Sequence, residues 1–232
     1  MRSFFNQFVP AQDCLLCAAA CGRRSLCPRC EATLPQLDGP LCPLCAQPLP
    51  GGAQHPCGEC LRHPPPWQGT LAAWRYGFPL DRMIQALKYR HHFGVIEPLV
   101  EPLAQLAAAR PLPDALLAMP LHRARQRSRG YNQSLLIARA LSGRLGVPLL
   151  HHACRRTRDT RPQAGLTPTQ RRSNLRRAFV CSPCVQGLNI AIVDDIMTSG
   201  ASLAQLSGAL SECGAQRIEC WVLARALRTG AS

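Results

Sequence analysis

Regular alternation of hydrophobic and polar positions begins after residue 66 and predicts a succession of strands and helices. In the segment 79–89, for example, Leu80, Ile84 and Leu87 fall on one face of a helix. The expected elements are a strand or hairpin over 67–76, helices over 79–89 and 96–109, a short core strand over 115–119, a helix beginning near Asn132, a strand over 190–193 and a helix after 202. This order predicts an α/β fold in which helices flank a parallel sheet.

The segment 190–202, IAIVDDIMTSGAS, has the most informative pattern. Its four leading apolar residues predict a strand that is buried on both faces, as in a parallel sheet. Asp194 and Asp195 follow at the point where that strand is expected to end. A small, hydroxyl-rich turn over 198–202 comes next, and leucines then recur at helical spacing.

This segment has the chemistry of a sugar-phosphate site. Ligands of open α/β sheets bind beyond the carboxyl ends of strands, and the backbone amides that open a helix can bind a phosphate. Adjacent carboxylates suit ribose hydroxyls and a hard cation such as Mg²⁺. The expected ligand-binding residues are Asp194, Asp195, Met197, Thr198, Ser199, Gly200, Ala201 and Ser202. The alternative is a buried strand, a turn and a helix with acids at the rim.

The chain has 232 residues, which is enough for one sizeable α/β domain and a small module. Its formal net charge is +14 and Lys88 is its only lysine, so arginine carries nearly all of the positive charge. The guanidinium group matches phosphate geometry, which favours anionic partners: nucleotides, pyrophosphate or nucleic acid. The alternative is a basic surface that only keeps the protein soluble. Nothing resembles a secretory signal or a membrane-spanning stretch, so we expect a soluble, cytoplasmic protein.

Eight of the fourteen cysteines form four CxxC pairs within the first 60 residues. Each pair can place two thiolates on one tetrahedral ion, and two pairs joined by a hairpin make a zinc ribbon. In a chain of this length without an export signal, metal binding is favoured over disulfides. The expected ligands of two Zn²⁺ ions are Cys14, Cys17, Cys27 and Cys30 for the first, and Cys42, Cys45, Cys57 and Cys60 for the second. A crossed arrangement, in which alternate pairs share an ion, is the alternative.

The other cysteines form no such sets. Cys181 and Cys184 make an isolated CxxC, for which a surface turn is favoured over a metal or redox site. Cys154, Cys213 and Cys220 are interpreted as buried or incidental thiols.

Three prolines at 64–66 predict a stiff exit from the cysteine-rich block. We therefore expect two domains, a double zinc ribbon over 1–65 and an α/β domain over 66–232. Because the block has few regularly spaced apolar residues, metal should supply much of its folding free energy.

Basic residues concentrate in three stretches. The run over 88–92 either favours a helix C-terminus or contacts pyrophosphate or nucleic acid. The stretch 121–134 lies between an expected strand end and a helix start, a position suited to pyrophosphate. The residues of this stretch expected to bind pyrophosphate are Arg123, Arg125 and Arg127.

The stretch 155–177 contains eight arginines, and its polar middle over 159–170 is interpreted as a mobile loop that covers the site. The residues expected to bind DNA are Arg155, Arg156 and Arg158.

The order of these motifs resembles the ComF/GntX family over nearly the whole chain. They are the zinc-ribbon cysteines, PPPW, LKYR, PLHRARQRSRGYNQS, Gln163 with RRSNLRRAF, and IVDDIMTSGAS. The last resembles the phosphoribosyl pyrophosphate loop of type I phosphoribosyltransferases, although the family often has Thr-Thr-Gly where this chain has Thr198-Ser199-Gly200. The resemblance implies a phosphoribosyltransferase-like fold and a role in natural competence or in the use of external DNA. It also implies the DNA-uptake machinery at the inner membrane as a partner.

Two functions follow from these expectations. In the first, the protein binds phosphoribosyl pyrophosphate or a nucleotide with Mg²⁺, and Asp194 and Asp195 are the catalytic residues if the ribosyl group is transferred. In the second, it is a non-catalytic, zinc-dependent module that binds single-stranded DNA and keeps a relic of the sugar-phosphate site. Few aromatic residues are available for base stacking, which counts against the second function. A purine-salvage enzyme with an added zinc module fits the whole-chain resemblance less well.

Overall fold

The computed structural model describes residues 12–52, 55–157 and 178–228. At its centre is a four-stranded parallel sheet with the strand order β1-β6-β5-β2. The strands are β1 (Gly69–Arg75), β2 (Ala115–Ala118), β5 (Asn189–Met197) and β6 (Arg217–Arg225). The parallel sheet that the hydrophobic pattern predicts is therefore confirmed, and the segment 67–76 contributes one strand, β1, to it.

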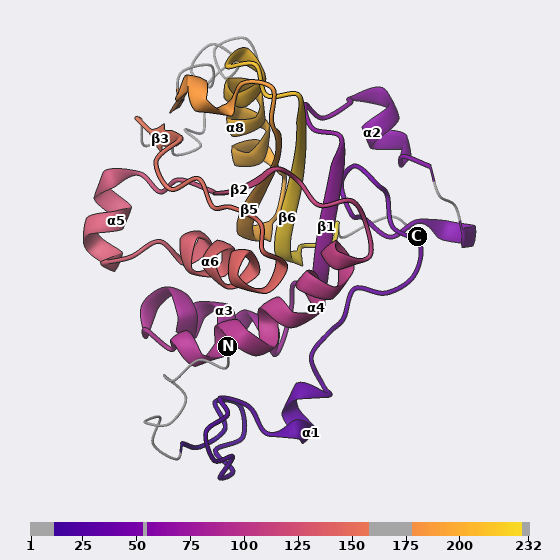
Figure 1. Cartoon of the computed structure of the whole chain (residues 1–232). Helices are drawn as coiled ribbons and strands as arrows, with labels where there is room; N and C mark the ends of the chain where they lie inside the picture. The colour runs from indigo at the N-terminus through magenta and orange to yellow at the C-terminus, as the bar shows by residue number, and fades with distance from the viewer. Residues whose placement is uncertain (1–11, 53–54, 158–177, 229–232) are drawn as a thin grey trace, which may run out of the picture.

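Helices cover both faces of this sheet (Figure 1). They are α3 (Leu80–Tyr89), α4 (Ile96–Ala108) and α6 (Gln133–Leu145) on one face, and α8 (Ala201–Glu212) on the other. In β5, Ala191 and Val193 pack in the cluster of α3, α4 and α6, whereas Ile190 and Ile192 pack in the cluster of α8. Because side chains of a strand alternate between its faces, this run of apolar residues is buried on both. Among the described residues, no helix is long and apolar enough to cross a bilayer.

The arginine-rich connection after β2 contains a helix that the sequence pattern does not predict. Helix α5 (Arg123–Arg129) begins after His122, whose side chain accepts a hydrogen bond from the amide of Ala124. It ends at Gly130, which has a φ of 79°. No residue of α5 is buried, and a helix without a buried face has no hydrophobic period by which to recognise it. Helix α6 then begins after Asn132, as predicted.

Strand β5 is longer than its apolar residues suggest, which corrects the expected position of the acids. It continues through Asp194 and Asp195 to Met197, with β6 paired alongside. On its other side, β2 ends at Ala118, opposite Val193. The two acids therefore lie within β5 but beyond the end of β2, at the carboxyl edge of the sheet.

The two cysteine-rich ribbons share one backbone design. In each, the first CxxC is followed by a residue of positive φ, Ala18 (58°) or Ala46 (52°). A short helix then begins directly after the first cysteine of the second CxxC. These helices are α1 (Pro28–Glu31) and α2 (Gly58–Arg62). Each ribbon thus combines a tight turn and a helix start, and each of these carries one cysteine pair.

The two ribbons nevertheless lie against different parts of the molecule. In Figure 1, α1 lies at the bottom of the view and α2 at the upper right. Leu26 and Leu34 of the first ribbon pack in the cluster of α3, α4 and α6, and Ala46 of the second packs in the cluster of α8. Short 3₁₀ helices complete the described elements, at Pro50–Gly52, Phe93–Val95 and Pro183–Val185.

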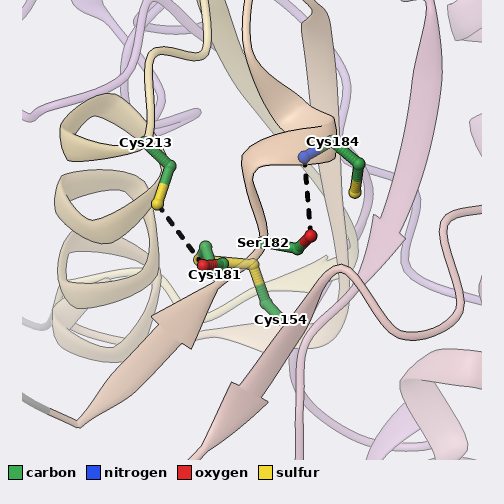
Figure 2. Close-up of a disulfide and its surroundings, with 5 residues drawn as sticks. All are labelled: Cys154, Cys181, Ser182, Cys184 and Cys213. Atoms are coloured by element: carbon green, nitrogen blue, oxygen red, sulfur yellow. Dashed lines mark hydrogen bonds between the residues drawn. A yellow bond between two sulfur atoms is a disulfide. The ribbon is translucent and has the colours of Figure 1, made fainter.

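A disulfide joins Cys154 to Cys181 across a separate antiparallel pair of strands, β3 (Cys154–Arg156) and β4 (Phe179–Cys181). The two cysteines are direct partners in this ladder, with Cα atoms 4.2 Å apart. Figure 2 shows Cys213 beside the bond, where its thiol donates to the carbonyl of Cys181 at 3.5 Å, whereas the thiol of Cys184 points elsewhere. The interpretation of Cys154 as an incidental thiol, and of Cys181 as part of a surface turn alone, is thereby corrected. No local pattern announces a pairing between residues 27 positions apart.

Candidate functional site

Residues from three elements hold the two acids at the carboxyl edge of the sheet. Asp195 of β5 forms an ion pair with Lys88, in the last turn of α3. Its Oδ2 also accepts a hydrogen bond from Nε2 of Gln133 at 3.5 Å. Asp194 accepts a hydrogen bond at Oδ1 from Oγ of Ser134 at 2.8 Å. The end of α3 and the start of α6 therefore meet β5 at these carboxylates.

The two acids differ in their electrostatic environment. Asp195 is 5% exposed, and Lys88 balances its charge. Burial, and then repulsion from Asp195, raise the pKa of Asp194 to about 7, although the hydrogen bond from Ser134 acts in the other direction. With all three groups ionised, two carboxylates and one ammonium leave one net negative charge. This oxygen-rich donor set is of the kind that Mg²⁺ prefers.

The turn that follows β5 exposes polar groups. Thr198 and Ser199 are exposed, and Gly200, with a φ of 77°, is the N-cap of α8. Oγ of Ser199 accepts a hydrogen bond from the amide of Ala201 at 3.4 Å. The first turn of a helix leaves amides without intrahelical partners, so the start of α8 offers N–H donors at the same edge of the sheet. Met197 is 2% exposed, and its carbonyl accepts hydrogen bonds from Arg225 and from the amide of Ala226.

The three arginines expected to bind pyrophosphate lie on the exposed helix α5. Arg123 and Arg127 line an open hollow together with Gln126, and the side chain of Arg125 is exposed. Within the described residues, no hydrogen bond or ion pair joins these arginines to the two acids. Contact between them and a pyrophosphate stays a prediction.

Sequence reasoning flagged the stretches 88–92 and 121–134 but did not name the residues in them that meet the two acids or their partners, which are Lys88, Arg129, Gln133 and Ser134. Arg129 donates from Nη1 to Oε1 of Gln133 at 2.6 Å, and its guanidinium lies 5.1 Å from the ring centroid of Tyr89. Lys88 carried the clearest signal, as the single lysine of the chain at the end of an expected helix. Nothing local marks Ser134, because its partner Asp194 lies 60 residues later.

The arginines expected to bind DNA lie only partly in the described region. Arg155 is exposed on β3, and the guanidinium of Arg156 lies 5.6 Å from the ring centroid of Phe179 on β4. Arg158 and the expected mobile loop over 159–170 lie outside the described residues. DNA binding by this stretch therefore stays a prediction.

The structure gathers the eight ribbon cysteines into two sets of four, each with its Sγ atoms within 4.8 Å of one another. The sets are Cys14, Cys17, Cys27 and Cys30 in the first ribbon, and Cys42, Cys45, Cys57 and Cys60 in the second. Neighbouring pairs, not alternate pairs, thus lie together. Cys21 belongs to neither set, and its thiol donates to the carbonyl of Arg24 at 2.7 Å.

The thiols within each set affect one another: hydrogen bonds with neighbouring thiols raise the pKa of Cys30 to about 12, and burial raises the pKa of Cys45 to about 11, whereas one thiol of each set has a lowered pKa. Burial raises the pKa of Cys14, but hydrogen bonds from backbone amides, among them that of Cys27, outweigh it and lower the pKa to about 6. The same balance, with the amide of Cys60 as the main donor, lowers the pKa of Cys57 to about 7. Four sulfur ligands gathered around one point are the donor set of a structural zinc site. The two sets therefore fit two structural Zn²⁺ ions.

Comparison with known proteins places the chain in a family. The double zinc ribbon domain family matches residues 5–61. DNA utilization protein YhgH of Escherichia coli O157:H7 is 35% identical, covering 92% of this chain and 97% of that protein. Competence protein F of Haemophilus influenzae is 32% identical, covering 97% of this chain and 100% of that protein. The chain belongs to the ComF/GntX family of competence and DNA-utilisation proteins.

The expected architecture is thus confirmed as a parallel sheet with flanking helices and an N-terminal double zinc ribbon. Among solved structures, the chain is similar to glutamine phosphoribosylpyrophosphate amidotransferase from B. subtilis complexed with ADP and GMP. The TM-score is 0.40 at 20% identity, and the similarity covers 54% of this chain and 25% of that one. We conclude nothing about ligands from a likeness of this size.

Proposed function

We propose that this protein binds phosphoribosyl pyrophosphate or a nucleotide, together with Mg²⁺, and that it acts in DNA uptake or in the use of external DNA. The observation that carries the proposal is the pair Asp194 and Asp195, held by Lys88 and Ser134 at the sheet edge where α8 begins. Membership in a family of competence and DNA-utilisation proteins supports the biological setting.

Each part of the site has a role in this proposal. The carboxylates of Asp194 and Asp195 accept hydrogen bonds from ribose hydroxyls, and the amides and hydroxyls of 198–202 bind the 5′-phosphate. Bound Mg²⁺ would neutralise pyrophosphate charge, held by the two carboxylates directly or through water. Arg123, Arg125 and Arg127 would donate to the pyrophosphate from α5.

Ribosyl transfer would add one chemical step to this binding. The bond between the anomeric carbon and a pyrophosphate oxygen breaks, and an acceptor takes the ribosyl group through an oxocarbenium-like transition state. In this step the carboxylates of Asp194 and Asp195 would stabilise the positive charge that develops on the ribose. Release of pyrophosphate, measured with and without candidate acceptors, tests this step separately from binding.

Calorimetry on the full-length, zinc-loaded chain tests the proposal. We expect phosphoribosyl pyrophosphate to bind in a Mg²⁺-dependent manner, and the double variant Asp194→Asn/Asp195→Asn to lose that binding while it stays folded. Asp114→Asn is a matched control, because Asp114 accepts a hydrogen bond from the amide of Asn189 at the opposite end of β5. Absence of binding to the wild-type protein at millimolar ligand would mean that the site is a relic.

A second candidate function is binding of single-stranded DNA without catalysis, and one surface favours it. At the end of α5, the half-buried Arg129 lies 5.1 Å from the ring centroid of Tyr89, which is 68% exposed, and Phe93 is 44% exposed. The ring of Tyr131 lies 5.1 Å from that of Phe93. Arginines bind the phosphates of single strands, and aromatic rings stack on bases. The aromatic residues are few, but the fold brings several of them together beside basic side chains.

One sample can distinguish the two functions. Calorimetry with phosphoribosyl pyrophosphate and with single-stranded DNA, both on the same zinc-loaded protein, gives the two affinities directly. If the arginines near the acids serve both ligands, pyrophosphate will displace DNA. DNA binding without any sugar-phosphate binding would favour the second function.

A further inference from the structure

Arg225, the last residue of β6, is a buried cation that links two distant parts of the chain. It is 2% exposed, and its guanidinium donates to four backbone carbonyls. Its Nε donates to the carbonyl of Cys45 at 2.6 Å. Its Nη1 donates to the carbonyls of Met197 at 2.8 Å and Thr198 at 2.5 Å. One side chain therefore joins a cysteine of the second ribbon to the start of the turn that the proposed function assigns to phosphate.

The second cysteine set can supply the negative charge that a buried guanidinium needs. A zinc ion with four thiolates carries two net negative charges. With zinc bound, Arg225 would lie between a negatively charged centre and the turn, because it donates to the carbonyl of Cys45 on one side and to those of Met197 and Thr198 on the other.

Trp67 makes a second link between the same two regions. Its indole Nε1 donates to the carbonyl of Leu44 at 2.6 Å, and Leu44 lies inside the CxxC of Cys42 and Cys45. The indole ring packs on Gly200, where an added Cβ would lie 3.2 Å from Cη2 of Trp67. Thr70 reinforces the link, since its Oγ1 donates to the same carbonyl at 2.7 Å.

The first ribbon has no comparable position in the fold. Its Cys14, Leu26 and Leu34 pack in the cluster of α3, α4 and α6, on the face of the sheet opposite to α8. The chain therefore contains an internal control, because it has two cysteine sets of the same local design and Arg225 and Trp67 link only the second of them to the turn.

We propose that the second zinc ribbon is a structural part of the phosphate turn, and that Arg225 and Trp67 are the positioning residues that connect them. Loss of order at Cys42, Cys45, Cys57 and Cys60 would release the carbonyls of 197–198 and the packing on Gly200. The functional consequence, weaker binding of a phosphorylated ribose, rests on the proposed function. The structural consequence, a less ordered turn, does not.

Matched cysteine variants of the full-length chain test the metal side. Cys27 and Cys57 occupy equivalent places, each directly before the short helix of its ribbon. Both Cys27→Ser and Cys57→Ser should lower the zinc content. We expect only Cys57→Ser to speed hydrogen exchange of the peptide 197–203, and only this variant to weaken the affinity for ribose 5-phosphate, by about tenfold or more. Equal exchange of that peptide in the two variants would overturn the proposal.

Variants that keep the ribbon intact test the two positioning residues. Trp67→Phe keeps a ring on Gly200 but loses the donor to Leu44, and Arg225→Gln loses the charge and most of the donors. We expect normal zinc content, faster exchange of 197–203 and a weaker affinity in both, with partial recovery in Arg225→Lys. Unchanged exchange in both would refute the link. If the wild-type protein binds neither ribose 5-phosphate nor phosphoribosyl pyrophosphate with Mg²⁺, the proposed function fails, and the exchange data still decide the link.

Discussion

The two zinc ribbons have the same local structure, yet the fold gives them different surroundings. Each has a turn with a residue of positive φ, at Ala18 or Ala46, and each gathers four sulfurs within 4.8 Å. The first packs beside α3 and α4, the layer from which Lys88 reaches Asp195. The second lies beside the turn that opens α8, with Arg225 and Trp67 between them.

This difference shows that a repeated module need not have a repeated role. Cysteine spacing determines which sulfurs can share a metal ion, because each CxxC is closed by local hydrogen bonds. What surrounds the metal site depends on where the sheet and helices place it. We infer that the first ribbon stabilises the helical layer, whereas the second also supports the turn that opens α8.

The largest expected effect concerns the metal itself. Purified protein should contain two Zn²⁺ per chain, and Cys27→Ser should unfold the first ribbon while the α/β domain stays folded. Structural zinc contributes roughly 10–16 kcal/mol to the folding of small modules. Elemental analysis, together with circular dichroism of the variant, checks this. Fewer than one zinc per chain in a fully folded preparation contradicts the prediction.

Removal of Lys88 should have the next largest effect. Lys88 belongs to α3, in the helical layer against which the first ribbon packs. The side chains of Lys88 and Asp195 are 18% and 7% exposed, so Lys88→Met leaves a mostly buried carboxylate without its counter-ion. We expect a loss of up to about 3 kcal/mol in the free energy of unfolding, measured with urea at pH 8. The double variant Lys88→Met/Asp195→Asn should recover most of the loss. Zinc content should not change, and a change would mean that the ion pair also supports a ribbon.

The next prediction tests whether arginines outside the two ribbons bind single-stranded DNA. Replacing Arg155, Arg156 and Arg158 with Gln should lower the affinity for single-stranded DNA and leave zinc content unchanged. The dependence of log affinity on log salt should also flatten, by about 0.7 for each phosphate that the variant no longer binds. The matched variant replaces Arg123, Arg125 and Arg127 with Gln. If neither variant alters binding, the DNA surface lies elsewhere, and the two ribbons become the next candidates.

The smallest expected effect is a pH dependence of stability from Asp194. Its pKa is raised from 3.8 to about 7 in the fold, so the folded protein binds more protons than the unfolded chain between these values. The contribution of Asp194 to stability therefore falls as pH rises from about 4 to about 7. Asp194→Asn lacks this contribution, so the difference in the free energy of unfolding between the variant and the wild-type protein, measured at several pH values, should shift in favour of the variant as pH rises across that window. A constant difference between the two proteins would contradict this, and Asp114→Asn is the control.

The sequence by itself determined those features whose cause is local. Four CxxC pairs predict two sets of metal ligands, because the two cysteines of a pair are always close together. The apolar run before Asp194 predicts a buried strand, and the turn up to Ser202 predicts a helix start, since both patterns reflect immediate neighbours. The order of these elements was enough for the α/β fold. Helix α5 escaped prediction because it buries no residue.

Tertiary structure alone decided which distant side chains meet. Lys88 reaches Asp195 because α3 ends at the carboxyl edge of the sheet. Arg225 and Cys45 are 180 residues apart in sequence, yet the guanidinium of Arg225 donates to the carbonyl of Cys45 because β6 ends against the second ribbon. Such contacts form only after the sheet has brought the elements together, so no spacing along the chain records them.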